Sequence, residues 1–438
     1  MLKGLEVSVR KFSEFSKIID YRIEAEYFLK KFLQVDDVLS KNKNCYFSDC
    51  FSFKNGRPYV SEEFDTNEKC NENIKHEINV AKIGDVTNKR NITEWSSISI
   101  DEFNNQKGEY LKDGDILMTL TGDPPDVGKV NLIRIYDEHA TWNQRVARIQ
   151  IKDSKKILSA EYAFILLSSK YCRLQIERFA KGIRQRNLGN EGLDLIKIPL
   201  FPASFQEEIA SLVKLAHEKM SQSKRLYSEA ENLLLRELDL ENFTPKNEAV
   251  SIKRLSDTFS SGRLDAEFYQ SKYEKIENKI KNYKYGFGIL SDFIDNYSTG
   301  FPFQSETYTE NGIPLIRITN INNGELDLSN APKIPHKDTN LSPKDIAKEN
   351  DILISMSGSI GNSCKIPQGI TAVINQRIMR ITPKNYNFDV LPLMINSIIC
   401  QMQLEKIGTG GVQTNISASD ISKILIPPFA TTKPRKNR

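Results

Sequence analysis

Two acidic motifs come closest to catalytic chemistry, and both are incomplete. Asp123-Pro124-Pro125-Asp126 shares its first three residues with the Asp/Asn-Pro-Pro-Tyr motif of amino-methyltransferases, but it lacks the aromatic residue that stacks on a flipped base. Glu24-Ala25-Glu26 is an acidic pair without the Glu-x-Lys that follows such pairs in many restriction nucleases. A Pro-Pro turn and a helix surface are the simpler interpretations.

Motifs for metals and nucleotides are also missing from the sequence. The histidines and cysteines are scattered and form no cluster with metal-ligand spacing. The sequence has no G-x-x-x-x-G-K-[ST] phosphate loop, and Tyr285-Gly286-Phe287-Gly288 is a weak match to a cofactor loop. We therefore expect a non-catalytic chain that carries no cofactor and no metal of its own.

Cationic and amide side chains in loops offer a different chemistry, which is contact with DNA. Lys and Arg bind phosphates, whereas Gln and Asn can present donors and acceptors to base edges. The richest loop runs from Lys181 to Asn187 around Gly182. The predicted DNA contacts are Lys181, Arg184, Gln185, Arg186, Asn187, Arg145, Thr119, Thr121, Gln304, Ser305, Thr319, Asn320, Asn322, Arg377, Gln413, Thr414 and Asn415. A solvated loop residue or a local cap is the alternative for each of them.

An internal repeat supplies the elements that must position these side chains. Five blocks recur in the same order, and the last of them aligns without a gap. The paired blocks are Arg22–Phe28 with Arg263–Tyr269, Lys82–Asn88 with Arg317–Asn323, Gly114–Leu117 with Asn350–Leu353, Asn143–Arg145 with Asn375–Arg377, and Leu166–Pro199 with Met394–Pro427. Two diverged copies of one domain explain this order better than chance similarity does.

Each copy shows both strand and helix patterns. Ile313–Asn320 and Asp351–Ser357 are short β-branched runs bounded by Gly, Asn and Pro, which is typical of strands. Ala160–Phe179 and Leu391–Ile407 carry apolar residues at helical spacing. The fold class that we predict is α+β, with two mixed globules in tandem.

A long helix is predicted between the two copies. Ser204-Phe205-Gln206-Glu207 has the pattern of a capping box, and Pro245 ends the helical periodicity. A helix over Ser204–Leu238 would be about 50 Å long, or roughly one and a half turns of B-DNA. Apolar residues form a heptad seam that needs a partner helix. The predicted subunit-interface residues on this seam are Phe205, Ile209, Leu212, Ala216, Met220, Tyr227 and Leu234. A packing helix in an ordinary two-domain protein is the alternative.

The second copy contains a series of distinctive blocks in a fixed order: Ser298–Ser305, Gly312–Asn320, Asp351–Gly361, Asn375–Arg377, Gly408–Ile416 and Ile426–Pro428. These blocks resemble successive motifs of the target recognition domain of type I restriction-modification specificity subunits. The first copy carries weaker versions of them.

The resemblance implies two recognition domains joined by two helices that pair as an antiparallel coiled coil. It also implies partners: double-stranded DNA, modification subunits that methylate adenine with S-adenosylmethionine, and restriction subunits that cleave DNA with ATP and Mg. This sequence departs from the family after Pro428, because it ends at Arg438 where the second helix is expected. We expect either a shortened subunit that uses another polypeptide's helix or a truncated reading frame.

The resulting hypothesis is a DNA-reading subunit that recognises a two-part site and serves as a scaffold for partner enzymes. Its expected divisions are a first recognition domain (1–203), a spacer helix (204–245) and a second recognition domain (246–438). Without a signal peptide or a long apolar run, we expect a cytoplasmic protein that does not contact membranes. The alternatives are a subunit with its own methyltransferase or nuclease activity, and a coiled-coil interaction protein whose DNA reading has degenerated.

Overall fold

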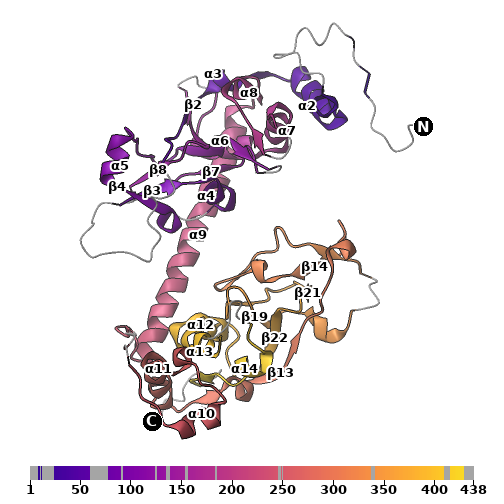
Figure 1. Cartoon of the computed structure of the whole chain (residues 1–438). Helices are drawn as coiled ribbons and strands as arrows, with labels where there is room; N and C mark the ends of the chain where they lie inside the picture. The colour runs from indigo at the N-terminus through magenta and orange to yellow at the C-terminus, as the bar shows by residue number, and fades with distance from the viewer. Residues whose placement is uncertain are drawn as a thin grey trace, which may run out of the picture. The chain divides into compact units, whose positions relative to one another are not determined.

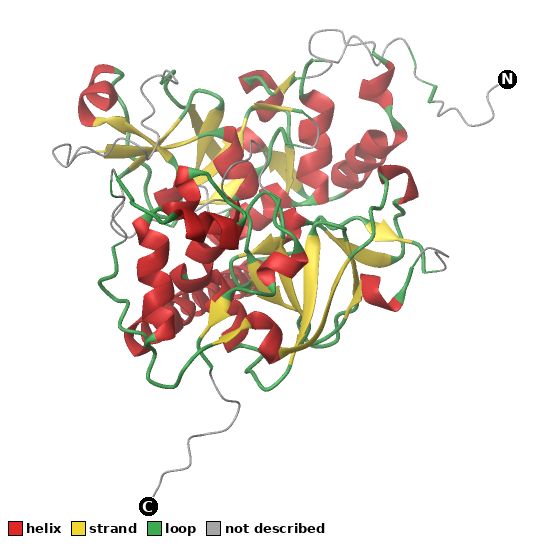
Figure 2. Ribbon diagram, turned by 60° about the horizontal axis from the view of Figure 1, so that its bottom comes forward, coloured by secondary structure: helices red, strands yellow, loops and turns green. Residues whose placement is uncertain are grey.

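The computed structural model divides the chain into two compact units, unit 1 (Met1–Gln222) and unit 2 (Ser223–Arg438). Both units mix helices with strands (Figures 1 and 2). The boundary lies inside a long helix, and the finer three-part division proposed from the sequence stays a prediction. The structure describes residues 8–9, 11, 24–59, 77–89, 92–123, 126–134, 139–152, 156–182, 185–244, 248, 250–336, 341–408 and 415–428.

Unit 1 contains a four-stranded antiparallel sheet of order β2-β9-β5-β7 and a three-stranded sheet of order β4-β3-β8, in which β3 and β8 are parallel. The strands are β1 (Asn44–Tyr46), β2 (Phe51–Asn55), β3 (Glu77–Ala81), β4 (Ser96–Ser99), β5 (Ile116–Thr119), β6 (Thr121–Gly122), β7 (Val130–Leu132), β8 (Ala140–Trp142), β9 (Val146–Ile151), β10 (Arg186–Asn187) and β11 (Lys197–Pro199). The helices are η2 (Ala25–Phe28), α2 (Lys30–Lys41), α3 (Phe47–Cys50), α4 (Ile83–Asn88), η4 (Ile92–Glu94), α5 (Ile100–Asn105), α6 (Ala160–Ser168), α7 (Lys170–Phe179), α8 (Asn190–Asp194) and α9 (Ala203–Glu237).

Unit 2 repeats this plan with sheets of order β13-β22-β19-β20 and β17-β14-β21-β18. The strands are β12 (Gly288–Ile289), β13 (Ile294–Thr299), β14 (Ile313–Ile316), β15 (Ile321–Asn322), β16 (Glu325–Leu326), β17 (Lys333–Ile334), β18 (Ile346–Ala347), β19 (Ile352–Ser355), β20 (Ser363–Lys365), β21 (Ala372–Ile374), β22 (Ile378–Pro383) and β23 (Leu425–Ile426). The helices are α10 (Leu255–Ser261), η5 (Ala266–Tyr269), α11 (Ser271–Lys281), η6 (Leu290–Phe293), η7 (Ser305–Thr307), η8 (Ile318–Asn320), η9 (Pro343–Asp345), α12 (Val390–Asn396), α13 (Ile398–Gly408) and α14 (Ala418–Ile421). The predicted α+β class and the duplication are confirmed.

The central strands β5 and β19 are apolar on both faces because each separates two cores. Ile116 and Met118 of β5 join the core under α6 and α7, whereas Leu117 points into a second core on the opposite face. In β19, Ile352 and Leu353 divide in the same way. Alternation of side chains along a strand turns one apolar run into the wall between two cores.

The predicted helices 160–179 and 391–407 are each broken by a serine. At Ser169 the backbone is extended and the side chain accepts a hydrogen bond from the Cys172 backbone N–H, so that α7 begins as a new helix. At Ser397 the hydroxyl donates to the Met394 carbonyl at 2.7 Å. The helical spacing is therefore correct within each piece, but local serine hydrogen bonds end the first helix.

Buried side chains confirm the repeat in atomic detail. Gln175 in unit 1 donates to the Lys197 carbonyl at 2.9 Å and accepts from the Lys197 backbone N–H at 2.8 Å. Gln403 in unit 2 makes the same pair of bonds with Leu425, at 2.9 and 2.7 Å. In both units one glutamine side chain therefore ties a helix to the last short strand.

The long helix α9 begins at Ala203, so Ser204 lies inside the first turn and not at the predicted cap position. In unit 1 the buried Ala210 and Val213 lie along this helix. Gln206 accepts from the Leu158 backbone N–H at 3.1 Å and donates to the Lys156 carbonyl at 2.9 Å. The residues of α9 that belong to unit 2 include Leu234, which is 6% exposed in the core of that unit.

Candidate nucleic-acid interface

In unit 1 the Asn143-Gln144-Arg145 turn joins β8 to β9 and is held by neighbouring segments. The Asn143 backbone N–H donates to the Ala81 carbonyl at 3.0 Å. The Leu120 N–H donates to the Arg145 carbonyl at 2.9 Å, and the Leu188 N–H donates to the Leu120 carbonyl at 2.8 Å. The turn, the loop after β5 and the loop before α8 therefore meet at one place.

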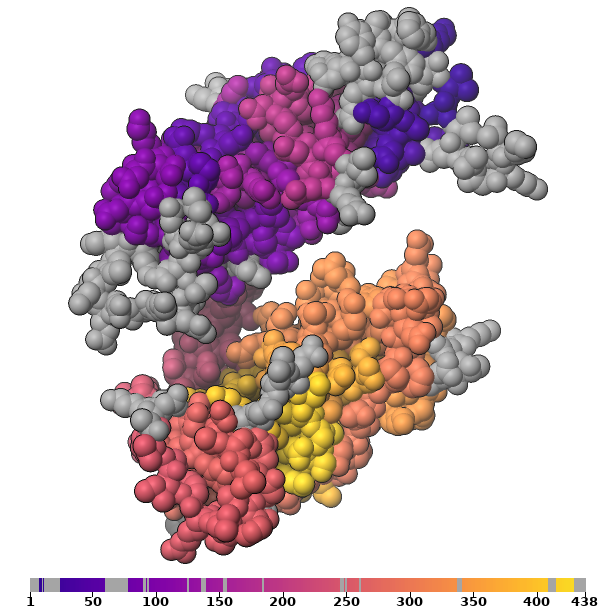
Figure 3. All heavy atoms as spheres, viewed as in Figure 1, coloured from indigo at the N-terminus to yellow at the C-terminus, as the bar shows by residue number. Residues whose placement is uncertain are grey.

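Unit 2 builds the same meeting point from equivalent residues. The Met356 N–H donates to the Arg377 carbonyl at 2.9 Å, and the Ile416 N–H donates to the Met356 carbonyl at 3.0 Å. The Asn375 N–H donates to the Ile316 carbonyl at 3.0 Å, as Asn143 does to Ala81. In Figure 3 the yellow atoms of the C-terminal part of unit 2 lie against orange atoms of the same unit, which agrees with these bonds.

A glycine packs behind the turn in each unit. A Cβ on Gly56 would overlap the Trp142 and Asn143 carbonyl oxygens, and a Cβ on Gly300 would overlap the Ile374 carbonyl. The close approach of the two backbones therefore requires glycine at both positions. This support makes the turn a rigid platform.

Several predicted contacts lie exposed at this meeting point. In unit 1 they are Arg145, Lys181, Gln185 and Asn187, and Thr121 is half-buried beside them in the β6–β10 pair. The Lys181 and Asn187 backbones pair with each other across the loop, at 2.9 and 2.7 Å. The arrangement brings cationic and amide side chains together, as contact with nucleic acid requires.

In unit 2 two of the predicted contacts bind each other. The Arg377 guanidinium donates to the Asn415 side-chain carbonyl oxygen at 2.8 Å, and both residues are exposed. Arg184, Gln413 and Thr414 lie outside the described residues. Gln304, Ser305, Thr319 and Asn322 are also exposed. Their contact with DNA stays a prediction.

Three predicted contacts have a structural role that explains their polarity. Thr119 is fully buried, and its hydroxyl donates to the Asp126 carbonyl at 2.5 Å, which removes it from the surface. Asn320 is 4% exposed and accepts from the Arg317 backbone N–H as a helix cap. Arg186 pairs with Glu26 at 3.0 Å and donates to the Glu177 carbonyl. We correct the prediction for Thr119 and Asn320, because buried side chains cannot reach a base.

Gln144 and Gln376 are exposed at the centres of the two turns, and the predicted contacts did not include them. The signal that could have identified them is the unchanged Asn-Gln-Arg triplet, of which only the arginines were selected.

The predicted interface residues of α9 divide into two groups. Phe205, Leu212 and Met220 are exposed by 42%, 58% and 58%, and Ala216 is also exposed. The remaining predicted interface residues make contacts within the chain. Ile209 packs on the core of unit 1, Leu234 is buried in unit 2, and the Tyr227 hydroxyl accepts a hydrogen bond from the Asn396 side chain at 3.2 Å. Further exposed apolar residues of α9 are Leu215, Leu226 and Leu233.

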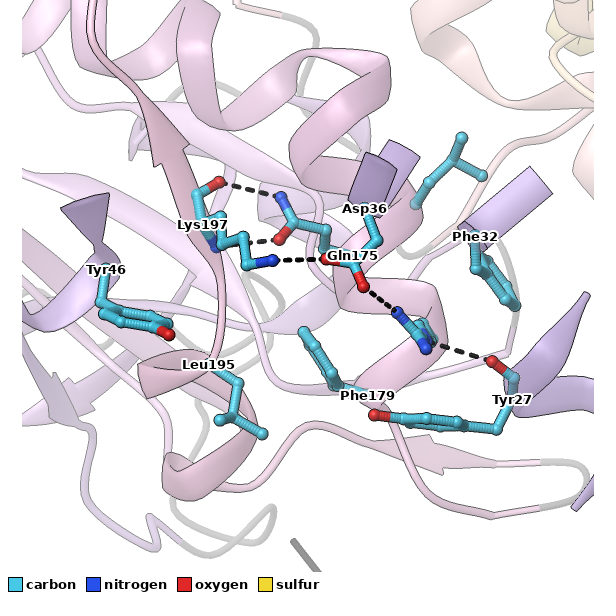
Figure 4. A pocket seen from close by; sticks show the side chains of 10 residues that line it. Tyr27, Phe32, Asp36, Tyr46, Gln175, Phe179, Leu195 and Lys197 are labelled. Carbon is cyan, nitrogen blue, oxygen red and sulfur yellow. Dashed lines mark hydrogen bonds and ion pairs between the residues drawn. The ribbon is translucent and has the colours of Figure 1, made fainter. Parts of the chain in front are cut away.

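A second candidate is a pocket of about 240 Å³ between α2 and α7 of unit 1, which Figure 4 shows from close by. Asp36 accepts from Lys197 at 2.6 Å and lies 3.5 Å from Arg178. Burial alone would raise the pKa of the Asp36 carboxyl, but the hydrogen bond and charge of Lys197, aided by Arg178, lower it below its ordinary value. The charged groups of this pocket satisfy one another.

Unit 2 has an equivalent pocket of about 360 Å³ lined by Phe268, Glu277 and Lys406. Lys406 pairs with Glu277 at 2.5 Å and lies over the Phe268 ring, as Arg178 lies over Tyr27 in unit 1. The ion pairs recur in both copies, where they join α2 to α7 in unit 1 and α11 to α13 in unit 2, and we therefore interpret both pockets as packing features.

Within the part of the chain that the structure describes, no group of three His, Cys, Asp or Glu residues could hold a metal ion. Among the same residues, no helix has the length and apolar character needed to cross a membrane. Cys45, Cys50, Cys172, Cys364 and Cys400 are buried free thiols.

Comparison with known proteins identifies relatives across both copies. The family model described as "Type I restriction modification DNA specificity domain" matches residues 29–231 and 267–428. The specificity subunit of the type I restriction enzyme EcoBI from Escherichia coli is 23% identical over 387 residues, which cover 85% of this chain and 73% of that protein. The MjaVIII specificity subunit from Methanocaldococcus jannaschii is 28% identical over 154 residues, covering 32% and 35%.

Solved structures give more distant matches. The type I restriction-modification S subunit from M. genitalium has a TM-score of 0.39 and 16% identity, with 87% of this chain and 83% of that chain covered. The HsdS subunit from Thermoanaerobacter tengcongensis has a TM-score of 0.26 and 14% identity, covering 86% and 85%.

Proposed function

This chain belongs to the type I restriction-modification DNA specificity family, and we propose that it reads a two-part DNA site for partner enzymes that supply the catalysis. Unit 1 contacts one half of the site and unit 2 the other. The observation that carries this proposal is the duplicated meeting point of a rigid Asn-Gln-Arg turn with two loops, one in each matched region.

The proposed partners follow from the family. Modification subunits bind the exposed apolar face of α9, which includes Phe205, Leu212 and Met220. Leu215 is also exposed on this part of the helix, and several exposed apolar side chains along one helix are typical of a surface that a partner covers. In this proposal the modification subunits bind S-adenosylmethionine, and the restriction subunits bind ATP and Mg. Residues 429–438 lie outside the described residues.

A salt titration of DNA binding tests the proposal. The chain is purified together with its modification subunit, and its affinity for cognate and random duplexes is measured at 50 and 200 mM salt. A reader that contacts some 6–10 phosphates should lose about 10³–10⁵ in affinity over this range. It should also bind the cognate duplex more tightly at both salt concentrations.

Two other outcomes would contradict the proposal. Methyl transfer or DNA cleavage by the isolated chain would make it an enzyme. Binding of the modification subunit without any preference between cognate and random DNA would make it a coiled-coil interaction protein. A methyl-transfer assay with the chain alone, the modification subunit alone and the complex separates these cases.

A further inference from the structure

The two units agree in one part of the interface and differ in the rest. The turn has the same three residues in both units, and equivalent backbone hydrogen bonds hold it. The segment that follows the central strand differs in length. In unit 1 it is residues 120–127 and is closed by a hydrogen bond from the Gly128 N–H to the Thr119 carbonyl. In unit 2 it is only residues 356–360 and is closed by the equivalent bond from the Gly361 N–H to the Ser355 carbonyl. The residue that bridges the turn is Arg57 in unit 1 and Phe301 in unit 2.

We propose that the two Asn-Gln-Arg turns bind the DNA backbone independently of sequence, through Gln144 and Arg145 in unit 1 and Gln376 and Arg377 in unit 2. Base reading is left to the loops that differ. This inference rests on the proposed function and divides its interface into two parts with separate tasks.

The exposed side chains of the turn suit this task. Gln144 and Arg145 are both exposed, and so are Gln376 and Arg377. Amide and guanidinium groups donate hydrogen bonds to phosphate oxygens, and arginine adds a charge that is always present. Gln144 is the middle residue of the turn in unit 1, and its backbone N–H already donates a hydrogen bond to the Arg57 carbonyl at 2.9 Å. Its side chain is therefore the group that can bind a ligand.

The residues that hold the turn in place also favour a contact with the DNA backbone. The asparagine is half-buried in each unit, and its backbone N–H and carbonyl both make hydrogen bonds that hold the turn closed. Gly56 and Gly300 allow a second backbone to pass directly behind it. In unit 2, Asn415 also holds the Arg377 guanidinium. A contact that must be the same at two different half-sites needs such a fixed geometry.

The feature common to two different half-sites is the sugar-phosphate backbone, because base edges change with sequence and phosphates do not. If the turn read bases, identical turns would impose the same base on both half-sites. The parts that differ between the units, the loops and the Arg57/Phe301 position, can supply separate preferences.

The test uses the complex with the modification subunit and three variants: Arg145→Ala, Gln144→Glu and Lys43→Ala. Lys43 is an exposed cation between α2 and β1 and serves as the matched control. We measure the affinity for cognate and random duplexes at several salt concentrations. Tryptophan fluorescence confirms that each variant is folded, because both tryptophans, Trp95 and Trp142, are buried in unit 1.

Arg145→Ala should weaken cognate and random binding by the same factor and reduce the slope of log affinity against log salt by about 1. Gln144→Glu, which places a negative charge beside phosphates, should weaken both at least as much. Lys43→Ala should change neither. A loss confined to the cognate duplex, or no loss in a folded variant, would overturn the inference. Wild-type complex that shows no salt-dependent DNA binding would instead overturn the proposed function.

Discussion

Units 1 and 2 share a hydrogen-bonded skeleton but fill equivalent sites with different side chains. Beside the first short strand, Cys45 and Cys50 of unit 1 lie with their sulfurs 2.8 Å apart. At the equivalent positions unit 2 has Gly288 and Phe293, and a Cβ on this glycine would approach the phenylalanine ring at 2.7 Å. One site therefore holds either two small side chains or one large one. The comparison teaches that the skeleton carries the fold while paired side chains are exchanged.

The largest difference between the two units is expected when the equivalent aspartates before the central strands, Asp115 and Asp351, are replaced and the loss of unfolding free energy is compared. Asp351 lies 3.5 Å from Arg380, whose side chain is 14% exposed, and Asp115 lies 3.9 Å from Arg148, which also pairs with Glu109 at 3.0 Å. Asp351→Ala should cost about 3 kcal/mol of unfolding free energy, because it removes the carboxylate partner of the largely buried Arg380, which keeps its hydrogen bonds to the Ser298 hydroxyl and the Ile346 carbonyl. Asp115→Ala should cost less, about 1–3 kcal/mol, because Glu109 still pairs with the arginine.

Urea unfolding measures this difference. Circular dichroism reports both units, whereas tryptophan fluorescence reports unit 1 alone. Asp351→Ala should lower the midpoint seen by circular dichroism and leave the fluorescence transition in place. Equal costs for the two substitutions would show that Glu109 does not compensate.

The buried glutamines should behave alike. Gln175→Ala and Gln403→Ala each remove a side chain that binds both the N–H and the carbonyl of one strand residue. Each should cost about 2 kcal/mol, because the strand groups lose their partners. Urea unfolding of the two variants checks this, and clearly unequal costs would mean that the two sites are not equivalent.

Substitutions at Cys45 and Cys50, the pair that unit 2 replaces by glycine and phenylalanine, should have non-additive effects on the unfolding free energy. Cys50→Phe alone overfills its site and should cost about 1–3 kcal/mol. Adding Cys45→Gly, as in unit 2, should recover at least half of that loss. A double-mutant cycle followed by tryptophan fluorescence measures the coupling. If the two substitutions were simply additive, the sites would not be equivalent.

The smallest effect is expected from the ion pair between α2 and the rest of unit 1. The pKa of Asp36 is lowered, so the ionised carboxylate contributes stability above the ordinary pKa of about 3.9, and this contribution is lost as the pH falls through the lowered value. Because its side chain is 43% exposed, Asp36→Asn should cost only about 0.5 kcal/mol at pH 7. As the pH falls through the lowered pKa of Asp36, the difference in unfolding free energy between the variant and the wild type should shrink, and a difference that does not change with pH would assign the effect to packing.

The sequence was sufficient for the duplication and the long helix, because these depend on local periodicity and on residue identity between copies. The predicted strand Ile313–Asn320 was only partly correct, because β14 ends at Ile316 and Ile318–Asn320 form the 3-10 helix η8. It could not show which face of α9 is covered, since tertiary packing decides that Leu234 is buried while Leu233 is 61% exposed. The predicted heptad seam therefore mixed residues that pack within the chain with residues that are exposed on the helix surface.

Single polar residues were the least predictable part of the site. Thr119 and Asn320 are polar for structural reasons, because each satisfies backbone groups within its own loop. Such bonds depend on how the loop closes, which spacing does not reveal. Arg145 and Arg377 were selected as predicted contacts because their triplet is unchanged between copies, and the same triplet contains the exposed glutamines Gln144 and Gln376, which were not selected.

The most direct test of the central claim, that each unit reads its own half of the site, is to move a reading loop between the units. Residues 120–127 are replaced by residues 356–360, and methylated adenines are mapped by sequencing cells that express the chain with its modification subunit. The account predicts a two-part methylated motif in which the exchange alters one half only, while the reciprocal exchange alters the other. A change in both halves from a single exchange would contradict it.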